Sequence, residues 1–202
     1  MKLYSSPTTP FGRKISVQIL ESGLSDQVET VVVAGTPLDA GTMPIDRNPL
    51  GKIPALETPD GVVYDSRVVS RYLDDVSGKG LYPAAPALWR CLTLEATADG
   101  ILDAAVSMAY EVRLRPEGLR FPEWLEGQWT KIARALDAIE SEWMAALAGL
   151  VDMAQIGVAV ALEYIDFRHG SRNWREGRPK LAAWQAEFAK RPSMVATQPP
   201  AA

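Results

Sequence analysis

Hydrophobic residues recur with two different periods in the chain up to residue 77. Short runs rich in apolar and β-branched residues predict four strands: 2–6, 28–33 and the two runs that flank the turn Pro59-Asp60-Gly61. Apolar residues at helical spacing predict two helices: 11–22 and 66–77. The predicted order is β-α-β, then a loop rich in glycine and proline at 34–50, then β-β-α, with the strand at 28–33 buried.

The pattern changes past Pro83 and Pro86, where strand signals stop. From Leu88 onward, segments rich in Ala, Leu, Glu and Arg predict helices. These helices are broken at 115–118, 148–149 and 176–179. One of them is apolar enough to be buried, and Asp152 with Gln155 three residues later matches a capping box at its start. The expected fold class is α/β plus all-α, with three parts: a domain with a mixed four-stranded sheet at 1–78, a linker at 79–87 and an all-helical domain at 88–202.

Composition and charge exclude several classes of protein. The formal net charge of −4 leaves no basic excess that would follow a nucleic-acid backbone. No run of about 18 apolar residues could cross a bilayer, and the first residues lack the apolar stretch of a signal peptide. Cys91 is the single cysteine and His169 the single histidine, so we expect neither an intrachain disulfide nor a Cys/His zinc site. These features predict a cytoplasmic protein without a metal, a nucleic-acid partner or a membrane partner.

Residues that carry chemistry gather in three short stretches of the first domain. The stretch YSSPTTPFGRK (4–14) places hydroxyls directly before a predicted helix, and a helix N-terminus and a hydroxyl donor both favour a bound anion. In NPLGKIP (48–54), Pro54 stands at the start of a strand, where proline is tolerated. Further on, Asp65 and Ser66 open a helix whose unpaired N–H groups can bind a carboxylate.

In this order and at this spacing, the stretches YSSPTTPFGRK, NPLGKIP and YDS resemble the glutathione S-transferase superfamily, in its bacterial, cytosolic type with a Ser/Thr-containing active-site loop. The resemblance covers nearly the whole chain and implies a thioredoxin-like N-terminal domain. It implies that Pro54 is cis, that the backbone of Ile53 holds the cysteinyl part of glutathione and that Ser66 takes the γ-glutamyl carboxylate. Asp65 would orient the amino group of glutathione, while Lys52 either pairs with the other carboxylate or is a plain surface lysine.

The resemblance further implies that a hydroxyl of the first loop stabilises the glutathione thiolate, because a free thiol with a pKa of about 8.5 is mostly protonated at neutral pH. Thr9, directly before Pro10, is the first candidate, followed by Thr8 and then by Ser5 and Ser6. A threonine is bulkier than a serine and restricted at χ1, so we expect weak activation. The loop contains no cysteine, which disfavours thiol–disulfide exchange.

The helical domain should provide the pocket for an electrophile. Tyr110, Arg113 and Trp174 could line it, although amphipathic packing explains large residues at helical spacing equally well. Asp99 lies on an acidic helix face, and it either reaches the amino group of glutathione, as the resemblance implies, or is a solvated or interface charge. His169 is expected near a helix end, without a catalytic role.

Two functions fit these expectations. The first is glutathione S-transfer, in which the thiolate attacks a small hydrophobic electrophile for detoxification; isomerisation or reductive dehalogenation would use the same residues. The second is a non-catalytic glutathione-transferase-like module for ligand or protein binding. The resemblance implies a homodimer with glutathione as co-substrate. The motifs do not identify the electrophile.

Overall fold

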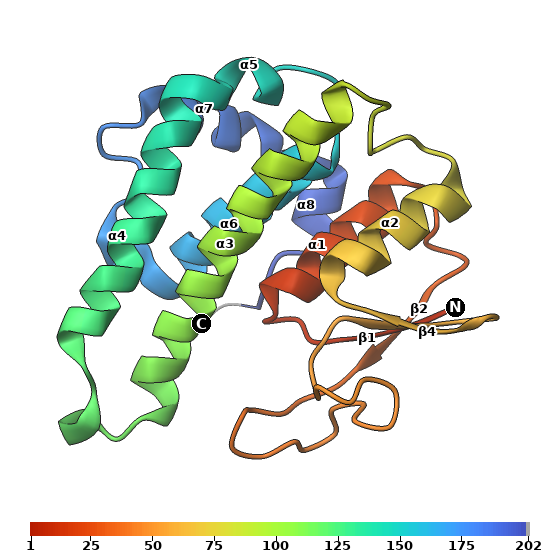
Figure 1. The fold of residues 1–202 in the computed structure, drawn as a ribbon, viewed down its shortest axis with the longest axis horizontal. Coiled ribbons are helices and arrows are strands. Elements are labelled where there is room, and N and C mark those ends of the chain that lie inside the picture. The colour runs from red at the N-terminus through yellow and green to blue at the C-terminus, as the bar shows by residue number, and fades with distance from the viewer. Residues whose placement is uncertain (201–202) are drawn as a thin grey trace. The chain divides into compact units, whose positions relative to one another are not determined.

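The computed structural model describes residues 1–200, so the last two residues of the predicted helical domain lie outside it. The chain divides into two compact units: residues 1–84 together with the segment from Arg191, and residues 85–190. The first unit contains the sheet, and the second is helical (Figure 1). No helix among the described residues is both long and apolar enough to span a bilayer.

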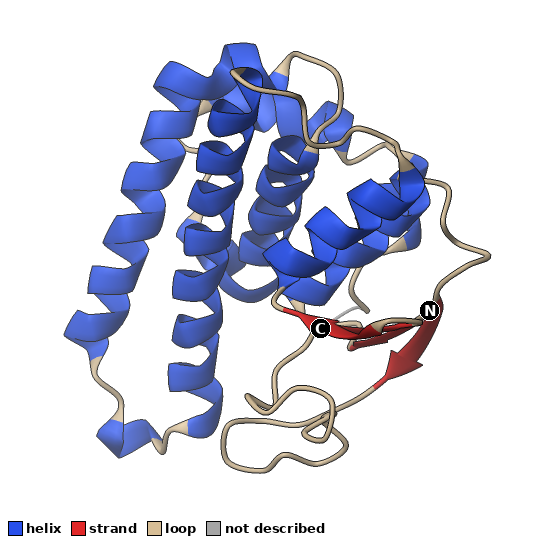
Figure 2. Cartoon of the chain, turned by 45° about the vertical axis from the view of Figure 1, so that its right-hand side comes forward, coloured by secondary structure: helices blue, strands red, loops and turns tan. Residues whose placement is uncertain are grey.

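The first unit has a mixed four-stranded sheet, as predicted. Its elements are β1 (Lys2–Ser5), α1 (Pro10–Glu21), β2 (Glu29–Val32), β3 (Ala55–Thr58), β4 (Gly61–Tyr64) and α2 (Ser66–Ser77). The sheet order is β2-β1-β3-β4, with β1 and β2 parallel and the other neighbours antiparallel. Helices α1 and α2 lie over one face of the sheet (Figure 2). The thioredoxin-like fold class expected for this part of the chain is therefore confirmed.

The core of this unit forms between the sheet and the two helices. Its fully buried members include Leu3, Ile15, Leu56, Val69 and Leu73. They come from β1, α1, β3 and α2 at the apolar positions that the two sequence periods require. The patterns that predicted the elements are therefore also the patterns that build the core.

One expectation about burial is wrong. The strand at 28–33 was expected to be buried, but β2 is an edge strand paired only with β1, and Val32 is 66% exposed. A β-branched run fits both a central and an edge strand, so its composition did not distinguish them. The Tyr4 ring is half-buried, because alternate residues of β1 point to opposite faces and Leu3 faces the helices. The Tyr4 hydroxyl donates to Glu57 Oε2 at 2.9 Å.

The last helix, α8 (Pro192–Ala196), belongs to the first unit, which differs from the predicted single domain at 88–202. Glu21 at the end of α1 accepts hydrogen bonds from Arg191 Nε at 2.9 Å, Arg191 Nη2 at 2.7 Å and the Ser193 hydroxyl. Arg13 Nη2 donates to the carbonyl of Met194 at 3.2 Å. These bonds join residues far apart in the sequence, so no local pattern announces them.

The second unit is helical throughout. Its α-helices are α3 (Ala87–Leu114), α4 (Pro122–Ala138), α5 (Met144–Leu147), α6 (Met153–His169) and α7 (Pro179–Phe188). Short helical turns connect them: η1 (Glu117–Leu119), η2 (Ile139–Trp143) and η3 (Gly170–Arg172). Helix α6 is the predicted buried helix, and Asp152 caps it by accepting from the Gln155 N–H at 2.9 Å. The capping box is only half formed, because the Gln155 amide donates instead to the Leu150 carbonyl at 2.7 Å.

Candidate functional site

Strand register brings the three sequence stretches to one edge of the sheet. Tyr4 near the end of β1 pairs with Ala55 at the start of β3, and Ala55 also pairs with Tyr64 at the end of β4. The loop that follows β1, the residues before β3 and the start of α2 therefore emerge side by side. Thr9 and Asp65 lie in two of these segments, at the N-caps of α1 and α2.

The N-terminus of α1 has open donors. Thr9 is its N-cap, with φ −86° and ψ 124°, and the Thr9 side chain makes no capping hydrogen bond. The first bond onto this cap runs from the Arg13 N–H to the Thr9 carbonyl at 3.0 Å. Pro10 has no N–H, so the N–H groups of Phe11 and Gly12 are the donors that precede this bond. Such a helix end attracts negative charge.

The other loop hydroxyls are placed differently from Thr9. Ser5 is the last residue of β1 and is 4% exposed, so its hydroxyl lies inside the unit. Ser6 Oγ and Thr8 Oγ1 are 3.4 Å apart on the outside of the loop, which a bond from the Thr9 N–H to the Ser6 carbonyl closes at 3.1 Å. Thr9, Thr8 and Ser6 are therefore open to a ligand, while Ser5 packs behind them.

The segment before β3 is held by a buried asparagine that the sequence analysis did not single out. Asn48 is 1% exposed, and its Nδ2 donates to the Lys52 carbonyl at 2.8 Å while its Oδ1 accepts from the Leu50 N–H at 3.0 Å. The Ile53–Pro54 peptide is cis, as the resemblance implied. Within residues 1–200, neither the N–H nor the carbonyl of Ile53 forms a hydrogen bond. The Lys52 side chain is exposed.

The start of α2 combines backbone strain with open N–H groups. Asp65, its N-cap, has φ 70° and ψ 128°, a conformation that costs a residue other than glycine about 1–3 kcal/mol and is typical of ligand clamps. Its carboxylate accepts from the Arg67 N–H at 2.9 Å. Burial alone would raise the pKa of the Asp65 carboxyl, but the hydrogen bonds and charge of Arg67 outweigh it and lower the pKa. Ser66 follows as the first helical residue and is 7% exposed.

The acidic face on α3 is partly buried. Glu95 and Asp99 are buried, at 2% and 4% exposure, whereas Asp103 is exposed. Because Asp99 is buried, the role of a solvated charge is wrong for it, whereas the role of an interface charge stays a prediction. A role for Asp99 toward glutathione stays a prediction.

Two further residues of the helical unit have structural roles. Cys91 is buried, and burial, together with the nearby Asp152 carboxylate, raises the pKa of its thiol to about 12, so it stays protonated at neutral pH. His169 ends α6 as predicted, and its Nε2 donates to the Ala105 carbonyl at 2.9 Å. Burial lowers the pKa of His169 below its ordinary value. Among the described residues, no group of three or more His, Cys, Asp or Glu side chains could hold a metal ion.

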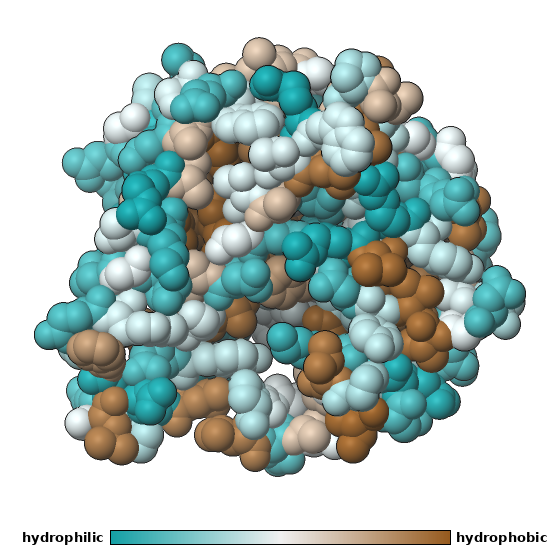
Figure 3. Space-filling model, viewed as in Figure 1, coloured by the Kyte–Doolittle hydropathy of each residue, from teal (hydrophilic) through white to brown (hydrophobic). Residues whose placement is uncertain are grey.

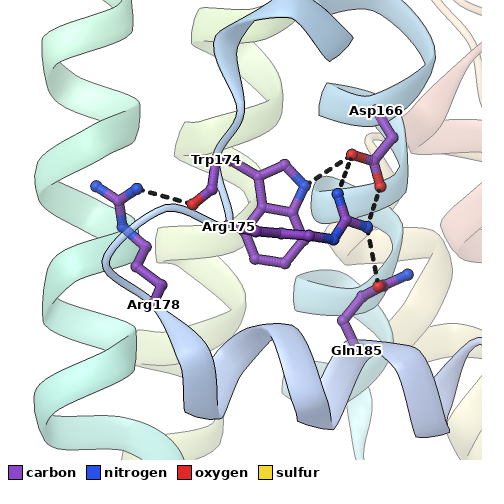
Figure 4. A network of polar contacts seen from close by, with 5 residues as sticks. All are labelled: Asp166, Trp174, Arg175, Arg178 and Gln185. Carbon is purple, nitrogen blue, oxygen red and sulfur yellow. Dashed lines mark hydrogen bonds and ion pairs between the residues drawn. The ribbon is translucent and has the colours of Figure 1, made fainter.

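Trp174, one of the proposed lining residues, is part of a polar network (Figure 4). It is 1% exposed, and its Nε1 donates to Asp166 Oδ1 at 2.8 Å. Arg175 adds two bonds to the same carboxylate, at 2.6 and 2.7 Å, and a third to Gln185 at 3.1 Å. The other two proposed lining residues lie on α3, where Tyr110 is half-buried and Arg113 is exposed.

A cavity of 390 Å³ in the first unit reaches the loop after β1, where Ser6 lines it. Its lining includes α1, β2 and the segment after α8, but not Thr9, Ile53 or Asp65. Two of the hydroxyls on its wall are used within the protein, because Ser16 donates to the Gly12 carbonyl and Thr197 to the Ser193 carbonyl.

Comparisons with known proteins agree with this fold. Residues 8–76 match the model of the glutathione S-transferase N-terminal domain, and residues 122–186 match the model of its C-terminal domain. The chain is 32% identical to the uncharacterised GST-like protein YibF of Escherichia coli strain K12 over the full length of both. It is 46% identical, with a TM-score of 0.96 and 98% of each chain covered, to a glutathione transferase family member from Pseudomonas fluorescens Pf-5 crystallised with bound glutathione.

A further crystal structure of a Pseudomonas fluorescens Pf-5 family member contains bound S-(propanoic acid)-glutathione. That chain is 45% identical, with a TM-score of 0.92, 99% of the present chain covered and 100% of the other. The protein described here therefore belongs to the glutathione S-transferase superfamily.

Proposed function

We propose that the protein binds glutathione at this sheet edge and activates its thiolate for attack on a small hydrophobic electrophile. The observation that carries the proposal is the convergence of three open polar sites on one edge, at the N-terminus of α1, the backbone of Ile53 and the N-terminus of α2. The family member from Pseudomonas fluorescens was crystallised with glutathione and with an S-substituted glutathione, which supports the same ligand here.

Each part of the tripeptide has a matching group. The N–H and carbonyl of Ile53 would pair with the cysteinyl backbone in the manner of an added strand. The N–H and hydroxyl of Ser66 would hold the γ-glutamyl carboxylate at a helix N-terminus, with Asp65 accepting from the amino group. Lys52 would pair with the glycyl carboxylate, and Asp99 remains a candidate partner for the amino group.

The chemistry requires little beyond positioning and a lowered thiol pKa. The N–H groups of Phe11 and Gly12 and the hydroxyl of Thr9 favour the thiolate over the thiol, and the thiol proton passes to solvent. The sulfur then forms a bond to the electrophilic carbon with its electron pair, and the leaving group departs with the electrons of the bond that breaks. Thr8 is the second candidate for the hydroxyl, and Ser6 is a third.

Calorimetric titration with reduced glutathione and with S-methylglutathione tests the binding site. We expect saturable binding of both ligands in the micromolar to millimolar range. The methyl thioether cannot ionise, so tighter binding of glutathione as the pH rises, without the same change for S-methylglutathione, would identify thiolate stabilisation. Failure of both ligands to bind would overturn the proposal.

Turnover by Thr9→Ala separates catalysis from a binding module. We expect a loss of about 10²-fold in turnover of an electrophile, because one oriented donor is removed, with glutathione binding retained. Thr30→Ala is the matched control, since Thr30 is an exposed threonine on β2. If wild-type protein binds glutathione but turns over no member of an electrophile panel, the non-catalytic module is the better description.

We also propose that the protein is a cytoplasmic homodimer. A reducing compartment fits the single cysteine. Exposed apolar side chains of the first unit, including Leu50 and Val68, could be covered by a second subunit. Hydrophobic and hydrophilic residues are interspersed on the face drawn in Figure 3, so no single apolar patch dominates that face. Sedimentation equilibrium should give twice the mass of the chain; a monomer at all concentrations would contradict the dimer.

A further inference from the structure

We infer that Gly12 is a positioning residue that orients the Thr9 hydroxyl by making room for the Thr9 methyl group. This inference deepens the proposed function, because it concerns how a threonine can serve where the loop offers no cysteine. It rests on a close approach between α1 and the residues around its N-cap.

Gly12 lies where no side chain fits. A Cβ built on Gly12 would be 2.5 Å from Thr9 Cγ2 and even closer to the Ser5 hydroxyl oxygen, and both distances are far shorter than a real Cβ contact. Gly12 has a helical backbone without a positive φ, so conformational freedom does not explain a glycine here. The glycine is explained by the space that Thr9 and Ser5 fill.

The Thr9 methyl group therefore occupies the side of the cap that faces into the helix. In an ordinary N-cap, the side-chain oxygen takes this side and accepts from the second or third helical N–H group, which here are those of Phe11 and Gly12. Thr9 makes no such bond. The Thr9 hydroxyl and the first N–H groups of α1 therefore form no hydrogen bond with each other, and both can donate to an incoming anion.

Threonine makes this arrangement depend on position 12. Its methyl and hydroxyl groups sit on the same carbon, so staggered rotation about χ1 moves them together in steps of about 120°. An alanine at position 12 would expel the methyl group from its place against the helix and turn the hydroxyl with it. A serine at position 9 has no methyl group and would escape this effect.

A double-mutant cycle of Gly12→Ala and Thr9→Ser tests the inference. It is built on Ser5→Ala, because the Ser5 hydroxyl would otherwise also clash with an alanine at position 12. With Thr9 present, we expect Gly12→Ala to lower turnover by about tenfold, while the affinity for S-methylglutathione changes by less than about twofold. With Ser at position 9, we expect Gly12→Ala to lower turnover by less than about twofold. Equal losses in the two backgrounds would overturn the inference.

Gly127→Ala is the matched control for a glycine replaced inside a helix. Gly127 lies in α4, and a Cβ there would meet nothing within 4 Å. We expect its turnover to equal that of the parent, and thermal melting of every variant reports whether the fold is kept. A tenfold loss in Gly127→Ala would mean that helix glycines act through general stability, and it would overturn the specific role of Gly12.

A direct readout of the Thr9 rotamer separates this inference from the proposed function. Three-bond NMR couplings of Thr9, or a crystal structure, should show χ1 rotated by about 120° in Gly12→Ala, whether or not glutathione binds. An unchanged rotamer would overturn the inference while leaving the glutathione proposal intact. If the parent protein does not bind glutathione, the proposed function is overturned. The Thr9 rotamer would still decide the role of Gly12.

Discussion

The polar groups around Asp166 and Gln155 in the helical unit bond to one another, whereas several of those at one edge of the sheet in the first unit do not. Asp166 accepts from both Trp174 and Arg175, and Gln155 donates to the carbonyl of Leu150. At the sheet edge, Thr9 caps nothing with its side chain, and the backbone of Ile53 is unbonded within residues 1–200. Polar groups normally find partners in a folded protein, so satisfied networks indicate stability and open clusters indicate binding.

Trp174→Ala should have the largest effect of these substitutions. It should lower the free energy of unfolding without a direct effect on glutathione binding. Removing a fully buried indole costs about 3–5 kcal/mol, because a cavity remains and Asp166 loses a donor. Urea unfolding followed by circular dichroism measures this loss. Trp174→Phe keeps most of the apolar volume and should cost about 1–2 kcal/mol.

Trp89→Ala is the matched control, because Trp89 is 64% exposed and should contribute little to stability. The folded Trp174→Phe protein should bind glutathione as the wild type does. A large loss of glutathione affinity in Trp174→Phe, without a loss of stability, would make the helical network part of the binding site and contradict the contrast between the units.

Ser66→Ala should have the opposite profile. We expect the dissociation constant for glutathione to rise about tenfold, because one hydrogen bond to a carboxylate is lost while the backbone N–H remains. The free energy of unfolding should change by less than about 1 kcal/mol. Calorimetric titration measures the first quantity, with Ser25→Ala as an exposed control. Unchanged affinity would remove the Ser66 hydroxyl from the site.

Asp152→Ala tests an N-cap whose side chain accepts a hydrogen bond from its own helix, whereas the side chain of Thr9 accepts none. Loss of the bond from the Gln155 N–H should lower the free energy of unfolding by about 1 kcal/mol. Burial raises the pKa of the Asp152 carboxyl despite its hydrogen bonds, so the charge itself is not favoured there. Asp152→Asn, which keeps a capping oxygen, should therefore be close to wild type. If both substitutions destabilise equally, the charge is what matters.

Acidification should weaken the attachment of α8 to α1 by a small amount. The hydrogen bond from Arg191 is the largest cause of the lowered pKa of Glu21, which burial opposes. A folded pKa below the unfolded one means that this contribution is present at neutral pH and is lost as the pH falls through the usual carboxylate range to the folded pKa. Glu21→Gln should cost about 0.5–1 kcal/mol at neutral pH and nothing in acid. A pH-independent cost would contradict the ionic contribution.

Sequence reasoning found the elements of the site but not the residues that support them. The helix at 66–77 and its opening Asp65-Ser66 were predicted with the bounds that the structure has. Asn48 was not singled out, although an Asn-Pro dipeptide is a turn signal, because its bond to the Lys52 carbonyl depends on burial. The close approach at Gly12 depends on the rotamers of Thr9 and Ser5, which a pattern of residue types does not contain.

Local patterns in the sequence predicted the order of strands and helices, the cap at Asp152 and the stretches that resemble the superfamily. These features depend on neighbours a few residues apart, where propensity and capping act. Only the folded chain shows that β2 is an edge strand, that α8 joins the first unit and that Ser5 is buried while Thr9 is open. Each of these outcomes depends on contacts between distant segments, and their energies are set by packing and burial.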